Sequence, residues 1–297
     1  MSEETTAARA GAIHDIGYRH YDGPRLGASY IRRSLFVETL RGAYGLGRSP
    51  RSKVMPFLLL AVMVLPAVVM GIVTSYFGSP SLPIRYTEYV IQLQVAVTIF
   101  LGAQCPAAMS RDLRYRVASL YFSRPLSRQQ YVQAKYAAMA VALFILMGLP
   151  ITLLLAGALL AELPLGDHLP DYLRAMAGAA IYAIVLAGIG LVVAALTPRR
   201  GLGVAAVVGV LLVLSGFQIA VSEMAAEFGS ETFLAYTGLI SPYTLVDGVV
   251  TAVLDAETSI GQGPPGAVGA AVFVAVTVLL VAGCYAALVV RYRKALS

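Results

Sequence analysis

The chain has 297 residues, of which 58% are hydrophobic and 13% are charged, whereas soluble domains carry about 25% charged residues. Its formal net charge is +6, from 22 Lys and Arg against 16 Asp and Glu. These values predict an all-α membrane protein. They exclude a nucleic-acid-binding protein, because no polar segment is large enough to form a module that reads DNA or RNA.

Six apolar runs divide the chain, each at least 21 residues long and free of Lys, Arg, Asp and Glu. A helix of about 20 residues crosses a hydrocarbon core of ~30 Å, so each run is predicted to be a transmembrane helix. In chain order the runs are Val54–Phe77, Tyr89–Met109, Tyr136–Ala161, Ala175–Thr197, Leu202–Ser222 and Ala267–Val290.

Twenty of the 22 basic residues fall on one side of these six runs, and the other side holds only Arg85 and Arg174. Because positively charged loops stay in the cytoplasm, both termini are predicted to be cytoplasmic, as an even number of spans also requires. The inner side sums to +14 and the outer side to −8, so the net charge combines two opposed membrane faces. The basic segments are 1–53, 110–135, 198–201 and 291–297.

Residues 1–53 are predicted to form a cytoplasmic N-terminal arm, followed by a six-helix transmembrane domain over residues 54–297. We expect residues 1–10 to be a disordered leader. Ser29–Tyr44 is predicted to be a helix, because Phe36, Leu40 and Tyr44 recur at helical spacing. Such a helix can lie in the cytoplasmic interface of the membrane, and packing against a protein partner is the alternative.

The predicted outer segment 223–266 contains a stretch, Phe233–Leu254, that is too apolar for an ordinary loop in water. Gly238, Pro242 and Gly248 are expected to break this stretch into two short helices. Non-helical backbone at membrane depth must be covered by protein. The stretch is therefore predicted either to re-enter the outer leaflet or to cap the helices from outside.

The chain lacks the residues for an ATP-hydrolysing site. A Walker loop needs Gly-Lys followed by Ser or Thr, and none of the three lysines (Lys53, Lys135 and Lys294) follows a glycine. The three histidines are scattered, the two cysteines lie inside predicted spans, and none of the six runs carries a carboxylate. We predict no catalytic residue, metal or cofactor in this chain, and the missing carboxylates argue against an ion-coupled carrier.

Two of the predicted spans contain uncharged polar side chains. Gln94 and Thr98 lie one turn apart in the second, and Ser215 and Gln218 share a face of the fifth. Such groups either bond to neighbouring helices or line a wet path for an amphipathic substrate, and both readings are open.

We name residues 110–136 the docking loop. This loop has six basic residues, an apolar centre that includes Leu120, Tyr121 and Phe122, and a break at Pro125. A plain positively charged loop is one interpretation, but the apolar centre favours an element that docks a soluble partner. The loop resembles that of the permease subunit of ABC-2 type ABC exporters. The residues that carry the resemblance are Arg111, Asp112, Leu120, Ser123, Pro125, Leu126, Ser127, Arg128, Tyr131 and Lys135.

The resemblance implies a multi-pass permease of the bacterial cytoplasmic membrane, and the chain is similar in character to permeases from actinobacteria. It would export a hydrophobic or amphipathic compound such as a drug, an antibiotic or a lipid. Two copies of a separate ATPase subunit would bind ATP and Mg and receive the docking loop, and a second identical or related permease would complete the path between the second and fifth helices. A membrane sensor that controls cytoplasmic partners is the alternative. The expected docking residues are Arg111, Asp112, Arg114, Leu120, Tyr121, Phe122 and Arg124.

Overall fold

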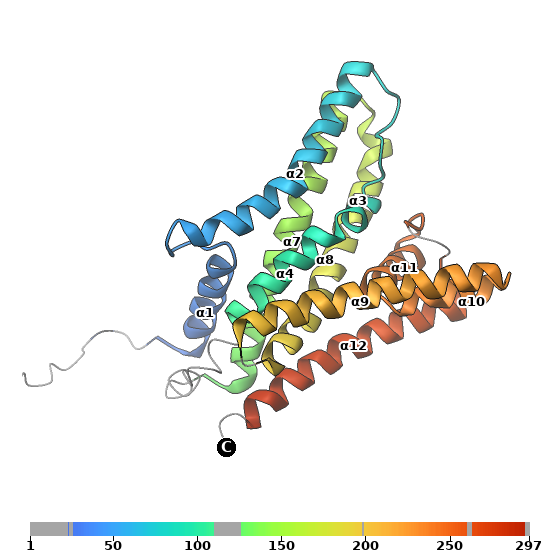
Figure 1. The fold of residues 1–297 in the computed structure, drawn as a ribbon. Coiled ribbons are helices and arrows are strands. Elements are labelled where there is room, and N and C mark those ends of the chain that lie inside the picture. The colour runs from blue at the N-terminus through green and yellow to red at the C-terminus, as the bar shows by residue number, and fades with distance from the viewer. Residues whose placement is uncertain (1–22, 24–25, 110–125, 198, 260–262, 295–297) are drawn as a thin grey trace, which may run out of the picture.

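The computed structural model describes residues 23, 26–109, 126–197, 199–259 and 263–294. Those residues form helices joined by turns, with no strand among them, which confirms the predicted all-α fold class. The elements, labelled in Figure 1, are α1 (Ala28–Ala43), α2 (Arg51–Phe77), α3 (Glu88–Gln92), α4 (Gln94–Ala108), α7 (Arg128–Leu160), α8 (Leu165–Leu196), α9 (Arg200–Glu227), α10 (Glu231–Tyr236), the 3-10 helix η1 (Thr237–Leu239), α11 (Pro242–Leu254) and α12 (Gly266–Lys294).

Within the described ranges, five helices are long and apolar enough to cross a membrane, namely α2, α7, α8, α9 and α12. They coincide with five of the six predicted spans. The second predicted span, Tyr89–Met109, differs from one continuous helix because the chain bends at Leu93 between α3 and α4. With 15 residues, α4 spans only about 22 Å. Most of its side chains are buried against protein, chiefly α8 and α9, so its short length exposes little backbone to lipid.

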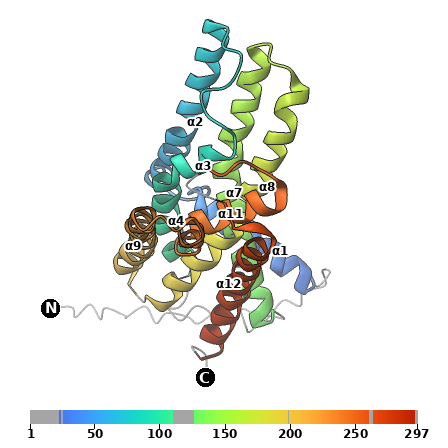
Figure 2. The same ribbon diagram turned by 90° about the vertical axis from the view of Figure 1, so that its right-hand side faces the viewer.

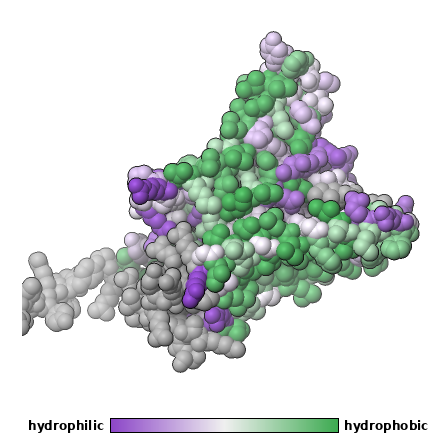
Figure 3. Space-filling view, in the orientation of Figure 1, coloured by the Kyte–Doolittle hydropathy of each residue, from purple (hydrophilic) through white to green (hydrophobic). Residues whose placement is uncertain are grey.

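The helices form two groups that diverge from a common end. Figure 1 shows α2, α7 and α8 running together, whereas α9 and α12 lean away from them and carry α10 and α11 near their far end. The start of α1 and the end of α12 lie at the same end of the molecule (Figure 2). On the face shown in Figure 3, apolar side chains cover most of both groups and hydrophilic ones gather in separate patches, as expected for a protein surrounded by lipid.

Glycines allow α2 and α7 to approach closely. A Cβ atom added at Gly71 of α2 would lie 2.8 Å from the Cα atom of Gly157 in α7, and one added at Gly157 would lie 2.7 Å from that of Gly71. Side chains at either position would force the backbones apart. Small residues serve this purpose in membrane helix pairs.

The predicted helix Ser29–Tyr44 forms as α1, whose apolar face packs on α7 of the same chain. Tyr44, just after its last residue, is buried, and its hydroxyl donates to the carbonyl oxygen of Ala142 at 2.8 Å. Burial raises the pKa of the Tyr44 phenol above its ordinary value. Much of the apolar face of α1 is therefore occupied by α7 of the same chain.

The apolar stretch of the outer segment forms a bent helix pair, α10–η1 and α11, with an angle of 113° between the two parts. Ser241 caps α11 and Pro242 occupies its first position, which explains where the second helix begins. Gly248 does not break α11 as the sequence suggested. It instead makes room for the ring of Phe273 in α12, which would lie 2.4 Å from a Cβ atom at that position. Residues 242–250 are all buried, so α11 is inserted between the other helices.

Candidate functional site

The docking residues predicted in the loop (Arg111, Asp112, Arg114, Leu120, Tyr121, Phe122 and Arg124) lie outside the described residues. The structure does describe the two ends from which this loop starts and to which it returns. These ends are the last turn of α4, at Ala108 and Met109, and the first two turns of α7.

A capping box fixes the first residue of α7. The Ser127 side chain accepts from the backbone N–H of Gln130 at 3.2 Å, and the Gln130 side chain accepts from the backbone N–H of Ser127 at 3.0 Å. Both bonds satisfy donors that a helix start would otherwise leave unpaired. Leu126, which precedes the cap, is buried. The Leu-Ser pair that contributed to the family resemblance thus determines where α7 begins.

Lys135 joins α7 to the end of α4. Its Nζ atom donates to the carbonyl oxygen of Ala108 at 2.6 Å and lies 5.2 Å from the centre of the Tyr131 ring. Only 6% of Lys135 is exposed. A cation is favourable at this place because a helix C-terminus carries partial negative charge and unpaired carbonyl groups. Lys135 therefore caps the end of α4, at a carbonyl group 27 residues earlier in the chain.

The end of α12 completes this junction. The Tyr292 hydroxyl donates to the Met109 sulfur at 3.1 Å, and its ring lies 5.1 Å from that of Tyr131. Next to it, Arg291 donates to the carbonyl oxygen of Ala195 near the end of α8, at 3.2 Å. We call the set of residues that make these contacts the loop base; it consists of Ala108, Met109, Ser127, Gln130, Tyr131, Lys135 and Tyr292. A force applied to the docking loop would reach α4, α7 and α12 together, because the loop base connects all three.

The polar residues predicted on α4 and α9 lie around the start of α11. The Thr98 hydroxyl is 2.7 Å from that of Tyr243, which also donates to the carbonyl oxygen of Gln94 at 3.1 Å. The Tyr182 hydroxyl of α8 donates to the carbonyl oxygen of Tyr243 at 2.9 Å. Tyr243 thus holds α11 against α4 and α8 with polar bonds in an otherwise apolar interior.

The two predicted residues of α9 also lie close to α11 and its N-cap. Ser215 Oγ is 3.2 Å from Ser241 Oγ, while Gln218 is buried and lines a cavity enclosed by α9, η1, α11 and α12. Tyr243, Ser241 and Asp247 were not among the predicted site residues, although the Ser241-Pro242 pair signals a helix start. Although none of the six predicted spans carries a carboxylate, the inserted helix α11 brings the carboxylate of Asp247 into the interior of the protein.

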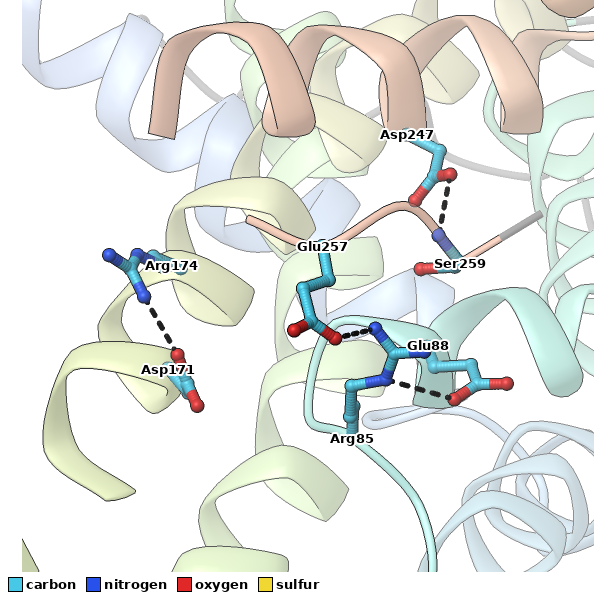
Figure 4. A network of polar contacts seen from close by, with 7 residues as sticks. All are labelled: Arg85, Glu88, Asp171, Arg174, Asp247, Glu257 and Ser259. Atoms are coloured by element: carbon cyan, nitrogen blue, oxygen red, sulfur yellow. Dashed lines mark hydrogen bonds and ion pairs between the residues drawn. The ribbon is translucent and has the colours of Figure 1, made fainter. Parts of the chain in front are cut away.

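The two arginines of the predicted outer side, Arg85 and Arg174, each pair with a carboxylate (Figure 4). Arg85 binds Glu257, which precedes α12, and lies 3.8 Å from Glu88. Arg174 Nη1 lies 2.9 Å from Asp171 Oδ1. Exposed pairs of this kind add little stability, but the Arg85–Glu257 contact joins the connection before α3 to the connection before α12.

Comparison with known proteins agrees with this architecture. The family model described as ABC-2 family transporter protein matches residues 107–295, which include the docking loop, its base, the inserted helix pair and four of the five long helices. No curated protein matches the chain. Permeases of this family are non-catalytic subunits that pair with ABC ATPase subunits, and those ATPases use the ATP. The chain therefore belongs to the ABC-2 family of transporters, as a multi-pass membrane permease.

Proposed function

We propose that this permease exports a hydrophobic or amphipathic compound across the bacterial cytoplasmic membrane, driven by two copies of a separate ABC ATPase that dock on residues 111–124. The observation that carries this proposal is the loop base. A loop whose two ends are tied to α4, α7 and α12 can pass a push from the ATPase to helices of both groups. Within the proposed N-terminal arm, residues 1–53, the helix α1 packs on α7 of the proposed transmembrane domain.

A second permease, identical or related, completes the proposed path. In support, α9 presents large exposed apolar side chains along its length, including Val213 and Phe217, while α4 beside it is mostly buried. The proposed path residues are Gln94, Thr98, Ser215 and Gln218. All four lie near the start of α11, so α11 would form part of the wall of the path. Replacing Gln218 with Leu should then change which compounds are exported while the protein still inserts.

The coupling test uses Leu120→Asp in the docking loop. An aspartate placed at a desolvated interface with the ATPase costs several kcal/mol, so this variant should insert normally but lose the ATPase on purification and lose export. Gln129→Glu is a control for adding a negative charge to the same loop, because Gln129 is exposed and lies outside residues 111–124. Full export and full ATPase recovery with Leu120→Asp would contradict docking through this loop. A compound that binds without any export would favour a sensor.

A further inference from the structure

The interior around Asp247 contains a cavity of about 280 Å³. Its lining comes from the end of α9, the α10–η1 segment, α11, α12 and the connection between α11 and α12. The carboxylates of Glu223 and Asp247, the amide of Gln218, and the hydroxyls of Thr237 and Thr244 contribute oxygen atoms to its wall, and Phe273 contributes an aromatic ring.

The hydroxyl groups of this wall present acceptors to the cavity. The Thr237 hydroxyl donates to the carbonyl oxygen of Leu234 at 2.7 Å, and the Thr244 hydroxyl donates to that of Gly238 at 2.9 Å. Their protons are used within the protein, so their oxygen lone pairs remain available. Asp247 is 4% exposed and accepts from the backbone N–H of Ser259 at 3.0 Å, which fixes the orientation of its carboxylate (Figure 4).

Besides the acceptor oxygens of the cavity wall, Gln218 independently indicates that the cavity holds a ligand. Its side chain is 6% exposed and lines the cavity, yet the part of the chain described by the structure provides no hydrogen-bond partner for its amide. An amide that faces such a cavity becomes costly if a bound molecule removes its water without replacing the hydrogen bonds. In a cavity of this size, a bound molecule can satisfy it.

We infer that this cavity binds the protonated amine of an amphipathic compound, and that such amines are cargo of the permease. An ammonium group has three donors and no acceptor, which matches a wall rich in acceptors. A negative charge attracts a cation strongly at this depth, because the low-dielectric surroundings screen it weakly. The Phe273 ring favours an organic cation next to it, and the apolar side chains of Leu234 and Ala226 suit its hydrocarbon part.

The first part of this inference, binding, is independent of transport. The second part, that the amine is cargo, rests on the proposed function. We therefore test binding with the permease alone, purified in detergent, by scintillation proximity with tritiated octylamine. Binding should saturate, and unlabelled octylamine should displace the probe whereas octanol, which lacks the charge, should not.

Variants locate the site. Asp247→Asn keeps an oxygen acceptor for Ser259 but removes the charge, and it should weaken octylamine binding at least about tenfold, as expected for a lost charge-assisted hydrogen bond. Asp255→Asn is the matched control. It removes the same charge from an exposed residue at the end of α11, whose left-handed backbone (φ 53°) suits asparagine, and its binding should equal that of the unmodified protein. Gln218→Glu adds a carboxylate and should tighten binding.

Absence of saturable binding, or equal binding by Asp247→Asn and Asp255→Asn, would overturn the inference. If Asp247→Asn does not fold, Glu223→Gln at the exposed rim and Gln218→Glu decide the same question, with Glu227→Gln on the next turn of α9 as control. Octylamine that binds but leaves ATP hydrolysis by the permease–ATPase complex unchanged would refute the cargo assignment alone. A complex that exports other compounds while octylamine fails to bind would refute this site and leave the proposed function standing.

Discussion

Lys135 offers the sharpest test of the loop base. Lys135→Met keeps the length and apolar stem of the side chain but removes the ammonium group that donates to Ala108. The carbonyl group at the end of α4 then loses its donor, and the partial negative charge of that helix end loses its cation. We expect the junction between α4 and α7 to open more often, while the rest of the fold stays intact.

The free-energy cost of Lys135→Met follows from the contacts that the ammonium group makes. A hydrogen bond to a charged group contributes about 1.5–3 kcal/mol, and a cation at a helix C-terminus adds roughly 0.3–1 kcal/mol. Because Lys135 is buried, relief of its desolvation cost offsets part of this sum. A net loss of about 2 kcal/mol remains, which corresponds to a roughly 30-fold higher population of the open junction.

Hydrogen exchange followed by mass spectrometry measures the opening of the junction between α4 and α7 directly. Peptides that cover the end of α4 and the start of α7 should exchange up to about 30-fold faster in Lys135→Met, and peptides of α2 should not change. Arg128→Met is the matched control, because Arg128 is an exposed cation in the first turn of the same helix. Equal exchange in the two variants would refute the claim that Lys135 holds the loop base together.

Two further predictions concern topology and packing. Cysteines placed at Ser79 and Gly166 should react with an impermeant thiol reagent from outside intact cells, and a cysteine at Ser297 should react only after lysis. The two native cysteines are buried and give little background. Labelling of position 297 in intact cells would contradict the proposed orientation. Gly157→Ala should lower the thermal midpoint, because overpacking against α2 costs about 1–3 kcal/mol, whereas Gly209→Ala meets no atom within 4 Å and should leave the midpoint unchanged or raise it.

The long helices could be predicted from the sequence because their cause is local. A run of more than 20 uncharged residues satisfies its backbone polar groups only as a helix in lipid, and five of the predicted runs form such helices. The bend at Leu93 could not be predicted in this way. The run from Tyr89 to Met109 is apolar throughout, and α4 can be short only because α8 and α9 cover it.

The candidate sites depended on contacts between distant segments. Ser127 and Lys135 were visible as parts of a motif, but the carbonyl that Lys135 caps lies 27 residues earlier. Thr98 and Tyr243 are separated by 145 residues. Asp247 belongs to a segment that reads as an outer connection, and only the insertion of α11 makes it a buried carboxylate. Periodicity within one helix carries no information about such neighbours.

The central claim is that this permease couples a separate ATPase to the export of amphipathic compounds. The most direct measurement is to purify the tagged chain from its native membrane, identify the proteins that accompany it, and measure ATP hydrolysis in lipid nanodiscs with and without amphipathic compounds. We predict an ABC ATPase in equal amount to the permease, with hydrolysis that rises when a transported compound is added and does not rise in Leu120→Asp. A permease that retains no ATPase would contradict the claim. So would an ATPase that hydrolyses ATP at the same rate with and without such compounds, and at the same rate with Leu120→Asp as with the unmodified permease.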